Sequence, residues 1–527
     1  MQKPVVKQSA SEFRYSCYSL GLLTIVYAVN FIDRQILAIL NEEIKADLLL
    51  SDAQMGFLYG TVFAIFYVLF GIPFGTLADT WIRRTLMAYA CAFWSTATAL
   101  SGLARNFLEL ALARIAVGVG EAGTGPCAYS LVSDLFVPAR RATVLAILTS
   151  GVYLGAGFGL FIGGQIVQRW NDMFPSGSAP FDLAGWQVAF FVVGLPGLLL
   201  AIWIRTLREP ERGRMDGIRD ESRKKPFAEF RAELYAILPG LTLVNLKMLG
   251  ARRTVIFANL FVLVVLGVGA YVMTMRFGNP PQWISLWIGY YAAFSWGQSL
   301  FLRDRPTAVL ILGTRSWVLF VLGVAMLGFS FYGFSYFTAP FFIRYHQIPI
   351  GDLGFSLGGI TAAFGFLGVT ISGVLADFWR KHNPRGRLYL LVIFALVQIP
   401  SGILMLYTTN TTYALCLNAV VVFCGATWLG IGGATISDLV LPRMRGRSTA
   451  VYILTITLLG LALGPFAVGL ISDVTGDLRV GLERGLSMNI VGVILIMLAA
   501  RCLEKDEGTL LERAQLAGES LQKTRLS

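Results

Sequence analysis

Arg114 and Glu121 are the residues of this sequence whose types and spacing first suggest chemistry. They lie inside an apolar run from about residue 107 to 136. Seven residues make two turns of an α-helix, so both side chains share one face, roughly 10 Å apart along the axis. Charges at such depth are costly and usually face a water-filled pathway or a charged partner. The same run holds glycines that permit close approach of a neighbour or a ligand: Gly118, Gly120, Gly123 and Gly125. The pattern indicates the working helix of a transporter.

The composition is that of an integral membrane protein. Of the 527 residues, 56% are hydrophobic and 14% are charged, whereas soluble domains contain about 25% charged residues. The net charge of +12 comes from short basic clusters between apolar runs, so it indicates the positive-inside pattern and does not favour nucleic acid binding. The 6 cysteines have no CxxC spacing and there are only 2 histidines, so neither a disulfide framework nor a metal site is expected. No nucleotide loop or nucleophile–base pair stands out. We therefore expect no enzyme and no cofactor, with an ion gradient and not ATP hydrolysis as the energy source.

Apolar runs of about 20 residues predict fourteen membrane helices. Six form a first bundle within residues 1–207, and six form a second bundle within 316–503. The insertion 208–315 combines a charged linker, an amphipathic segment near 227–249 and two extra spans near 254–275 and 282–302. We expect the amphipathic segment to lie along the membrane surface or the protein, and the tail 504–527 to form a short cytoplasmic helix.

Loop charge predicts the orientation. One set of loops holds basic groups, whereas the opposite loops are mainly acidic. The basic side is therefore expected to be cytoplasmic, with both termini there, in a plasma membrane (the inner membrane of a bacterium). The basic groups are Arg83 and Arg84, Arg140 and Arg141, the 205–231 linker, Arg380 to Arg387, and Arg443 to Arg447.

The two bundles repeat one another in sequence. The segment Gly75-Thr-Leu-Ala-Asp79-Thr-Trp-Ile-Arg83-Arg84 recurs as Gly373-Val-Leu-Ala-Asp377-Phe-Trp-Arg380-Lys381. The segment Ser133-Asp134-Leu-Phe-Val-Pro138 recurs as Ser437-Asp438-Leu-Val-Leu-Pro442. Parallel repeats of this kind are typical of rocker-switch transporters, with the substrate site between the halves.

The first repeated segment suggests a gate. Its glycine permits close helix packing, and its aspartate meets basic residues just beyond the end of the span. Such a cluster can bind the other half in one conformation and release it in another. The alternative is a set of local pairs, of Asp79 with Arg83 or Arg84 and of Asp377 with Arg380 or Lys381. Two copies at equivalent places favour the gate.

These residues resemble the signatures of the major facilitator superfamily. Gly75, Leu77, Asp79, Arg83 and Arg84 match the pattern after the second span, with Ile82 in place of the second glycine. Arg114, Gly118 and Gly120 match the pattern of the fourth span. The resemblance implies an all-α fold of two six-helix bundles, here with two extra helices between them. The Gly-Pro of the antiporter signature is incomplete because Ala156 replaces the proline, which leaves symport and antiport open.

Within that superfamily the chain is similar to the Spinster-type transporters. Asn30-Phe-Ile-Asp33-Arg34 and Gly118-Val-Gly120-Glu121-Ala122 carry this similarity. It implies a proton-linked carrier, and animal members of the family move sphingosine phosphate or lysophospholipids. The 208–315 insertion is not part of the resemblance.

Depth arithmetic suggests how the charged residues cooperate. The first span rises from the cytoplasm and the fourth descends, which places Asp33 and Arg114 at similar depth and Glu121 near the middle. Since both spans line the cavity of the resembled fold, we expect an Asp33–Arg114 ion pair that depends on protonation. A carboxylate in a low-dielectric site binds a proton more readily than one in water, so Asp33 is a usable proton carrier and Glu121 a second candidate. The alternatives are an interfacial Arg34 that reaches the outer surface and a structural network around Arg114 and Glu121.

Aromatic residues with polar tips are candidates for the substrate cavity, because they suit an amphipathic ligand. Packing or an interfacial belt is the alternative role for them. The candidates are Tyr27, Asn30, Phe63 and Tyr67 in the first bundle, and Tyr332, Tyr336, Phe337 and Trp428 in the second. Arg344 lies near the outer end of its span and is either a substrate contact or interfacial.

The sequence therefore predicts a monomeric secondary transporter of an amphipathic or anionic organic solute, with a lysolipid-like molecule implied by the resemblance. Its expected partners are a small-molecule or lipid substrate and membrane lipids. Export of drugs or organic anions shares every motif above. A receptor or scaffold with a carrier fold is the alternative from another class, and intact motifs in both halves argue against it.

Overall fold

The computed structural model describes residues 9–175, 179–213, 215 and 225–519, and all regular structure in these ranges is helical. Parts of the charged linker and of the tail lie outside these ranges. In the first repeat the helices are α1 (Ala10–Ile39), α2 (Asn41–Asp47), α3 (Asp52–Gly56), α4 (Val62–Thr80), α5 (Arg83–Ser101), α6 (Phe107–Glu121), α7 (Thr124–Leu135), α8 (Arg141–Met173) and α9 (Gly185–Arg205).

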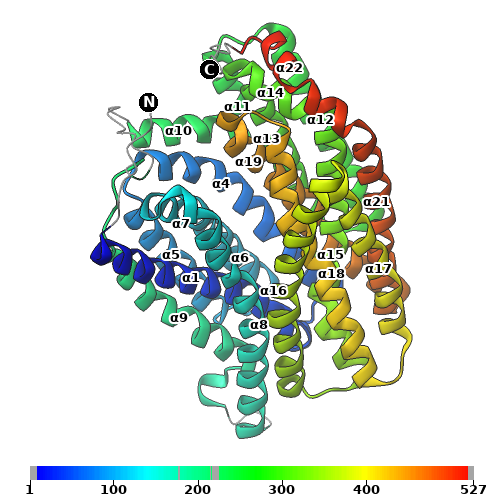
Figure 1. Cartoon of the computed structure of the whole chain (residues 1–527). Coiled ribbons are helices and arrows are strands. Elements are labelled where there is room, and N and C mark those ends of the chain that lie inside the picture. The colour runs from blue at the N-terminus through cyan, green and yellow to red at the C-terminus, as the bar shows by residue number, and fades with distance from the viewer. Residues whose placement is uncertain (1–8, 176–178, 214, 216–224, 520–527) are drawn as a thin grey trace. The chain divides into compact units, whose positions relative to one another are not determined.

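The insertion and the second repeat continue the series (Figure 1). The insertion holds α10 (Pro226–Ile237), α11 (Thr242–Met248), α12 (Arg253–Phe277), α13 (Pro280–Arg303) and α14 (Arg305–Leu312). The second repeat and tail hold α15 (Arg315–His346), α16 (Ile350–His382), α17 (Gly386–Tyr407), α18 (Thr411–Asp438), α19 (Arg445–Ile456), α20 (Gly464–Thr475), α21 (Leu478–Gly508) and α22 (Leu510–Leu516).

The predicted number of spans is confirmed in part. Helices occur at all fourteen predicted places, and 11 segments of the described residues are long and apolar enough to cross a membrane. The three that fall short are α5, α13 and the predicted fourth span. A turn at Ala122 and Gly123 divides that fourth span into α6, with 15 residues, and α7, with 12. Each piece is shorter than the roughly 20 residues that a span requires.

Internal contacts divide the chain into two compact units. The first unit comprises residues 1–234 and 335–366, and the second comprises 235–334 and 367–527. The end of α15 and the start of α16 therefore belong with the first repeat, and α11 to α14 belong with the second. The boundaries predicted at 207, 315 and 503 concern the sequence repeat and stay a prediction.

Close helix approach at glycines shapes the first unit. A methyl group at Gly118 of α6 would lie 2.7 Å from the carbonyl oxygen of Phe63 in α4. At Gly151 of α8 it would lie 2.8 Å from the carbonyl oxygen of Thr24 in α1. Such distances exclude any larger residue without a shift of the backbone. These contacts fix α6 against α4 and hold the side of α6 that carries the charged residues.

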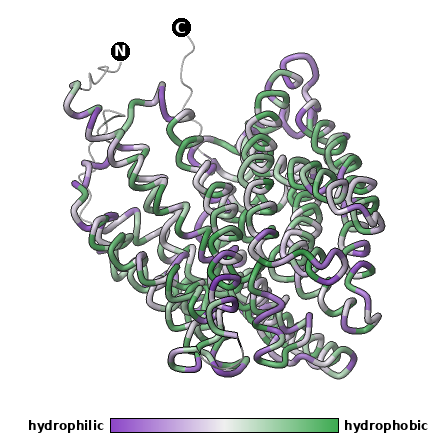
Figure 2. The backbone as a smooth tube through the Cα atoms, turned by 90° about the horizontal axis from the view of Figure 1, so that it is seen from below, coloured by the Kyte–Doolittle hydropathy of each residue, from purple (hydrophilic) through white to green (hydrophobic). Residues whose placement is uncertain are grey.

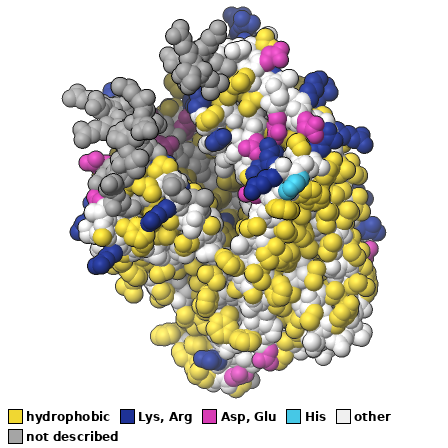
Figure 3. All heavy atoms as spheres, in the orientation of Figure 1, with side chains coloured by type: hydrophobic (Ala, Val, Ile, Leu, Met, Phe, Trp, Pro, Cys, Tyr) yellow, Lys and Arg dark blue, Asp and Glu magenta, His cyan; other side chains and the backbone are white. Residues whose placement is uncertain are grey.

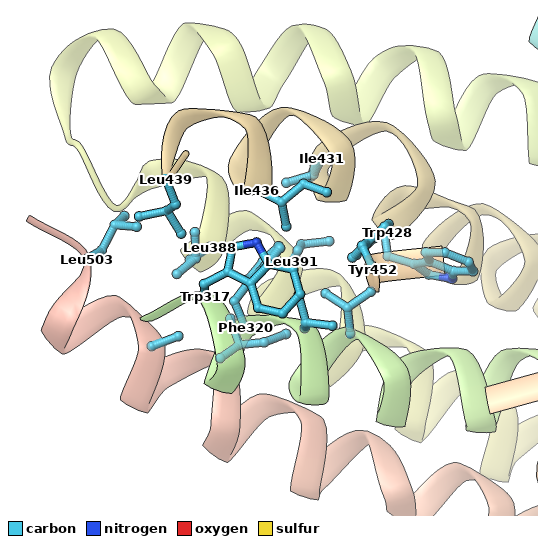
Figure 4. Close-up of a cluster of buried hydrophobic side chains, with 14 of the residues drawn as sticks. Trp317, Phe320, Leu388, Leu391, Trp428, Ile431, Ile436, Leu439, Tyr452 and Leu503 are labelled. Atoms are coloured by element: carbon cyan, nitrogen blue, oxygen red, sulfur yellow. The ribbon is translucent and has the colours of Figure 1, made fainter. Parts of the chain in front are cut away.

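The second unit has an apolar core to which α14 to α19, α21 and α22 contribute. One of its two tryptophans, Trp317, is buried and donates through Nε1 to Ser448 Oγ at 2.9 Å, which satisfies its polar atom. In Figure 4 the side chains of the cluster point toward one another from α15, α17, α18, α19 and α21. The labelled members are Trp317, Phe320, Leu388, Leu391, Trp428, Ile431, Ile436, Leu439, Tyr452 and Leu503.

The surface is that of a protein embedded in lipid. Figure 2 shows long hydrophobic stretches along the helices, and polar residues gather at many of the turns. On the face seen in Figure 3, hydrophobic side chains cover wide areas, and charged side chains gather in patches outside them. Wide apolar areas with few charges are typical of a multi-pass membrane protein.

Candidate functional site

Four charged side chains meet inside the first unit, between α1 and α6. Asp33 is 0% exposed, and Arg114 and Glu121 are each 1% exposed. The Arg34 side chain is 18% exposed. The sequence thus identified a buried charge cluster correctly, and the alternative in which Arg34 reaches the outer surface is wrong.

The pairing inside the cluster differs from the prediction. Arg34 Nε donates to Glu121 Oε2 at 2.5 Å. Arg114 makes no ion pair with Asp33 and instead donates through Nη1 to the main-chain oxygen of Asp33 at 3.5 Å. Adjacent residues of a helix point about 100° apart, so Arg34 turns toward Glu121 while the carboxylate of Asp33 turns elsewhere. The predicted Asp33–Arg114 ion pair is therefore absent from this conformation.

The carboxylate of Asp33 faces α5. Neither of its oxygens has a hydrogen-bond partner among the described residues, and the same holds for Trp94 Nε1 and Thr98 Oγ1. Trp94 and Thr98 lie close enough to influence the charge of the Asp33 carboxylate, and so do Glu121 and Arg114. A buried carboxylate without hydrogen bonds is costly when charged, and binding a proton removes that cost.

Aromatic rings surround the guanidinium of Arg34. Its Cζ lies 4.8 Å from the ring centroid of Phe31, 4.6 Å from Phe63 and 4.7 Å from Tyr67. Such stacking stabilises a cation away from water. The Asn30 side chain lies close enough to Glu121 to influence the charge of its carboxylate. The ring centroid of Tyr27 lies 6.2 Å from that of Tyr129. The four residues predicted for the cavity in the first repeat, Tyr27, Asn30, Phe63 and Tyr67, thus gather near one cation.

The four residues predicted in the second repeat do not form one group. Tyr332 lies 6.2 Å from Trp428, ring to ring, within the second unit. Tyr336 belongs to the first unit, where it stacks on Tyr59 at 4.2 Å, and both Tyr336 and Phe337 are 0% exposed. Tyr332 and Tyr336 lie one turn apart on the same helix but belong to different units, because the two units divide α15 between them.

The first gating segment holds a buried arginine. Arg83, at the first position of α5, is 0% exposed. It pairs with Asp134 at the end of α7 and donates through Nε to Glu209 Oε1 at 2.8 Å. Glu209 also accepts from the backbone nitrogens of Arg83 and Arg84 and so caps α5. Asp79 and Arg212 interact electrostatically. Arg212 Nη2 also donates to the carbonyl oxygen of Ala78 at 2.8 Å.

The second gating segment also holds ion pairs between arginines and carboxylates, but one of its arginines, Arg387, lies outside the predicted set. Arg387, near the start of α17, donates to Asp377 at 2.6 Å and to Asp438 at 2.7 Å. Arg380 pairs with Glu507 at 2.9 Å and with Asp438 at 3.3 Å. Lys381 is exposed and makes no ion pair with the described residues. The alternative that paired Asp377 with Arg380 or Lys381 is therefore wrong, since Arg387 takes that place.

The gating glycines do not make the close contacts expected of them. A methyl group at Gly75 would lie 3.9 Å from Pro126, an ordinary distance. One at Gly373 would meet no described atom within 4 Å. In this conformation neither glycine is needed for packing.

An ion-pair cluster at the opposite end of the first unit escaped the sequence analysis. Arg344, at the end of α15, donates to Glu42 at 2.7 Å and to Asp52 at 2.6 Å. Lys45 Nζ donates to Asp52 Oδ1 at 2.6 Å, the same oxygen that accepts from Arg344 Nη2. Arg344 was predicted to be a substrate contact or interfacial, and both roles stay predictions beside these ion pairs. The signal was the acidic loop between the first two spans, which has an arginine as its partner about 300 residues later.

Comparison with known proteins decides the family. Residues 23–465 match the sequence model of the Major Facilitator Superfamily. The chain belongs to the Major Facilitator Superfamily. It is 27% identical to an MFS-type efflux pump of Mycolicibacterium smegmatis over 93% of each chain. It is 25% identical to protein spinster homolog 1 of Xenopus tropicalis, with 88% of this chain and 74% of the relative covered. These matches support a transporter of the Spinster type, as the motifs predicted.

Solved structures share the fold. A bacterial homologue of the human lysosomal transporter Spinster, in an inward-facing and unoccupied conformation, has a TM-score of 0.65 at 24% identity and covers 95% of this chain and 98% of its own. The peptide transporter POT has a TM-score of 0.62 at 14% identity, and the match covers 92% of this chain and 95% of the POT chain. The predicted fold of the superfamily is thus confirmed.

Proposed function

We propose that this protein is a proton-coupled transporter of an amphipathic organic solute with an anionic group. The observation that carries the proposal is the buried carboxylate of Asp33, which has no hydrogen-bond partner among the described residues and lies beside the Arg34–Glu121 pair. The sequence contains no nucleotide-binding loop, so an ion gradient is the energy source that fits this site.

Charge counting indicates what the site binds. Asp33 and Glu121 balance Arg34 and Arg114 when both carboxylates are ionised. Protonation of either carboxylate leaves one net positive charge in a low-dielectric site, which favours uptake of an anionic group. In particular, a protonated Glu121 releases Arg34, whose guanidinium then offers its donors to a carboxylate or phosphate. Proton and anionic substrate thus favour each other's binding.

The aromatic surroundings suit the apolar part of such a substrate. Phe63 and Tyr67 stack at 5.5 Å beside Arg34, which provides an apolar wall next to a cation. A lysolipid or a sphingoid phosphate has this combination, as the resemblance to Spinster-type transporters implies. Export of small organic anions or drugs is the second candidate, supported by the 27% identity to an efflux pump over 93% of the chain.

Alternating access would use the ion pairs at the two ends of the spans. The pairs around Arg83 and Arg380 form at the basic ends, and Arg344 forms its pairs at the opposite end. The basic loops favour a cytoplasmic location for the Arg83 and Arg380 ends and for both termini, in the plasma membrane or a bacterial inner membrane. We propose a monomer as the working unit.

The test is counterflow in proteoliposomes, with lysolipids, sphingoid phosphates and small organic anions, each with and without a pH gradient. We expect Asp33→Asn and Glu121→Gln to abolish transport driven by the pH gradient. Asp172→Asn, an exposed carboxylate at the end of α8, is the matched control and should transport normally. Normal proton-driven transport by both site variants would refute the coupling, and transport of organic anions without any lysolipid would select the second candidate.

A further inference from the structure

The hairpin of α12 and α13 is almost bare of protein contacts on one side. Asn259 is the one buried residue among the 25 of α12. Large apolar side chains of α12 are strongly exposed, among them Phe257 at 68% and Phe261 at 69%. In a membrane such a surface faces acyl chains.

A polar network fixes the hairpin internally. Asn259 Nδ2 donates to Ser295 Oγ at 2.9 Å and to Gln298 Oε1 at 2.7 Å, and its Oδ1 accepts from Tyr291 at 2.7 Å. The network extends to α11, because Asn245 Nδ2 donates to Ser299 Oγ at 2.9 Å. Hydrogen bonds of this kind hold helices together where apolar contacts give little preference. Helices α11, α12 and α13 therefore form one fixed piece.

Basic side chains gather at one end of this piece. Gln298 Nε2 donates to the carbonyl oxygen of Val255 at 3.2 Å, which sets the last turn of α13 beside the first turn of α12. Arg303 is held there by a bond of 3.1 Å from Nη2 to Asn245 Oδ1. The exposed bases at this end, which we call the basic collar, are Lys247, Arg252, Arg253, Arg303 and Arg305.

Four of the five bases of the collar lack a carboxylate partner among the described residues. No acidic residue occurs between Glu233 and Asp304, and Asp304 is engaged by Arg443 and Arg447. Lys247, Arg252, Arg253 and Arg305 make no ion pair with the described residues. Exposed apolar side chains lie next to the collar, including Met248 at 62% and Phe301 at 44%. The collar thus offers positive charge at the boundary of an acyl-facing surface.

We propose that the basic collar binds the headgroup of an anionic phospholipid, whose acyl chains lie along the exposed face of α12. A zwitterionic lipid lacks the net charge, and free phosphate lacks the chains, so neither satisfies both parts of the surface. The site is separate from the transport pathway proposed above and does not depend on it.

The full-length protein in detergent micelles tests this by native mass spectrometry with phosphatidylglycerol, phosphatidylcholine or inorganic phosphate as the probe. We expect retention of phosphatidylglycerol over phosphatidylcholine. The triple variant Lys247→Gln, Arg252→Gln, Arg253→Gln should weaken that retention by about tenfold or more. The charge-conserving variant Arg252→Lys, Arg253→Lys should keep most of it, and Arg276→Gln, at the other end of the hairpin, should leave it unchanged.

Three outcomes would overturn the proposal. An unchanged lipid preference in the triple variant, with a normal melting temperature, would assign the charges to membrane orientation only. Equal competition by inorganic phosphate would remove the lipid from the ligand. A dimer that dissociates in the triple variant would make this face an interface between copies of the chain.

Discussion

Glu209 and Glu507 take matching places in the two repeats. Glu209 follows α9, Glu507 lies in the last turn of α21, and each accepts a hydrogen bond from an arginine of the gating segment. Arg83 Nε lies 2.8 Å from Glu209 Oε1, and Arg380 Nη2 lies 2.9 Å from Glu507 Oε1. Each arginine also pairs with the aspartate at the end of the fourth span, Asp134 or Asp438. Both gating segments thus join one arginine to one glutamate and one aspartate, although their sequences differ.

Removal of either glutamate should loosen its gate. Arg83 is 0% exposed and, among the described residues, keeps Asp134 as its anionic partner in Glu209→Gln, so we expect a loss of about 1–3 kcal/mol of stability. The loss in Glu507→Gln should be smaller, because the Arg380 side chain is 24% exposed and water replaces part of the interaction. Thermal unfolding in detergent measures both. Glu211→Gln, an exposed neighbour, is the control, and an equal effect of all three variants would contradict the argument.

The Arg34–Glu121 pair should show strong coupling in a double-mutant cycle. Arg34→Gln leaves Glu121 buried beside a weaker partner, and such a change costs about 3–5 kcal/mol for buried pairs. The double variant Arg34→Gln, Glu121→Gln removes both charges and should recover much of the lost melting temperature. Additive effects of the two single variants would mean that the pair of 2.5 Å contributes nothing specific.

The cluster of Arg344 should keep the far end of the first unit closed. Gln35 is 7% exposed and accepts from Tyr59, which stacks on Tyr336. A cysteine at position 35 should therefore react slowly with an impermeant maleimide added from outside. We expect Arg344→Gln to raise that rate about tenfold, since it removes bonds to two carboxylates. Arg344→Lys should lie between, and an unchanged rate in Arg344→Gln would show that other contacts close this end.

The ion pairs of Asp304 should resist acid. Burial alone would raise its pKa, but hydrogen bonds from Arg443 and Thr307 lower the pKa of Asp304 to about 2 from an ordinary value of 3.8. A carboxylate with a lowered pKa stabilises the fold above about pH 4 and loses this contribution as the pH falls toward 2. The melting temperature of Asp304→Asn should thus lie below that of the unaltered protein by the same margin at pH 5 and pH 8. A margin that vanishes at pH 5 would contradict the low pKa.

Residue types and repeats in the sequence predicted the family, the two bundles and the four buried charges. They did not predict the partners, because depth along a helix says nothing of the direction in which adjacent residues 33 and 34 point. Nor did they predict the ion pairs of Arg387 and Arg344, because only the folded chain brings the carboxylate partners of these arginines near. The division of α15 between two units is likewise invisible in its periodicity. Long-range packing decides each of these.

The α12–α13 hairpin also bears on how the chain is made. Of the 11 segments apolar enough to span a membrane, α12 is the most apolar, whereas α13 is not among them. Helix α13 contains Gln282, Ser295 and Ser299, all buried, and three of its polar side chains bond to Asn259 of α12. During synthesis we therefore expect α12 to partition into the bilayer unaided, and α13 to insert with the help of its hydrogen bonds to Asn259. We expect a substitution of Asn259 to cause incomplete insertion of α13 by the ribosome-bound translocation machinery.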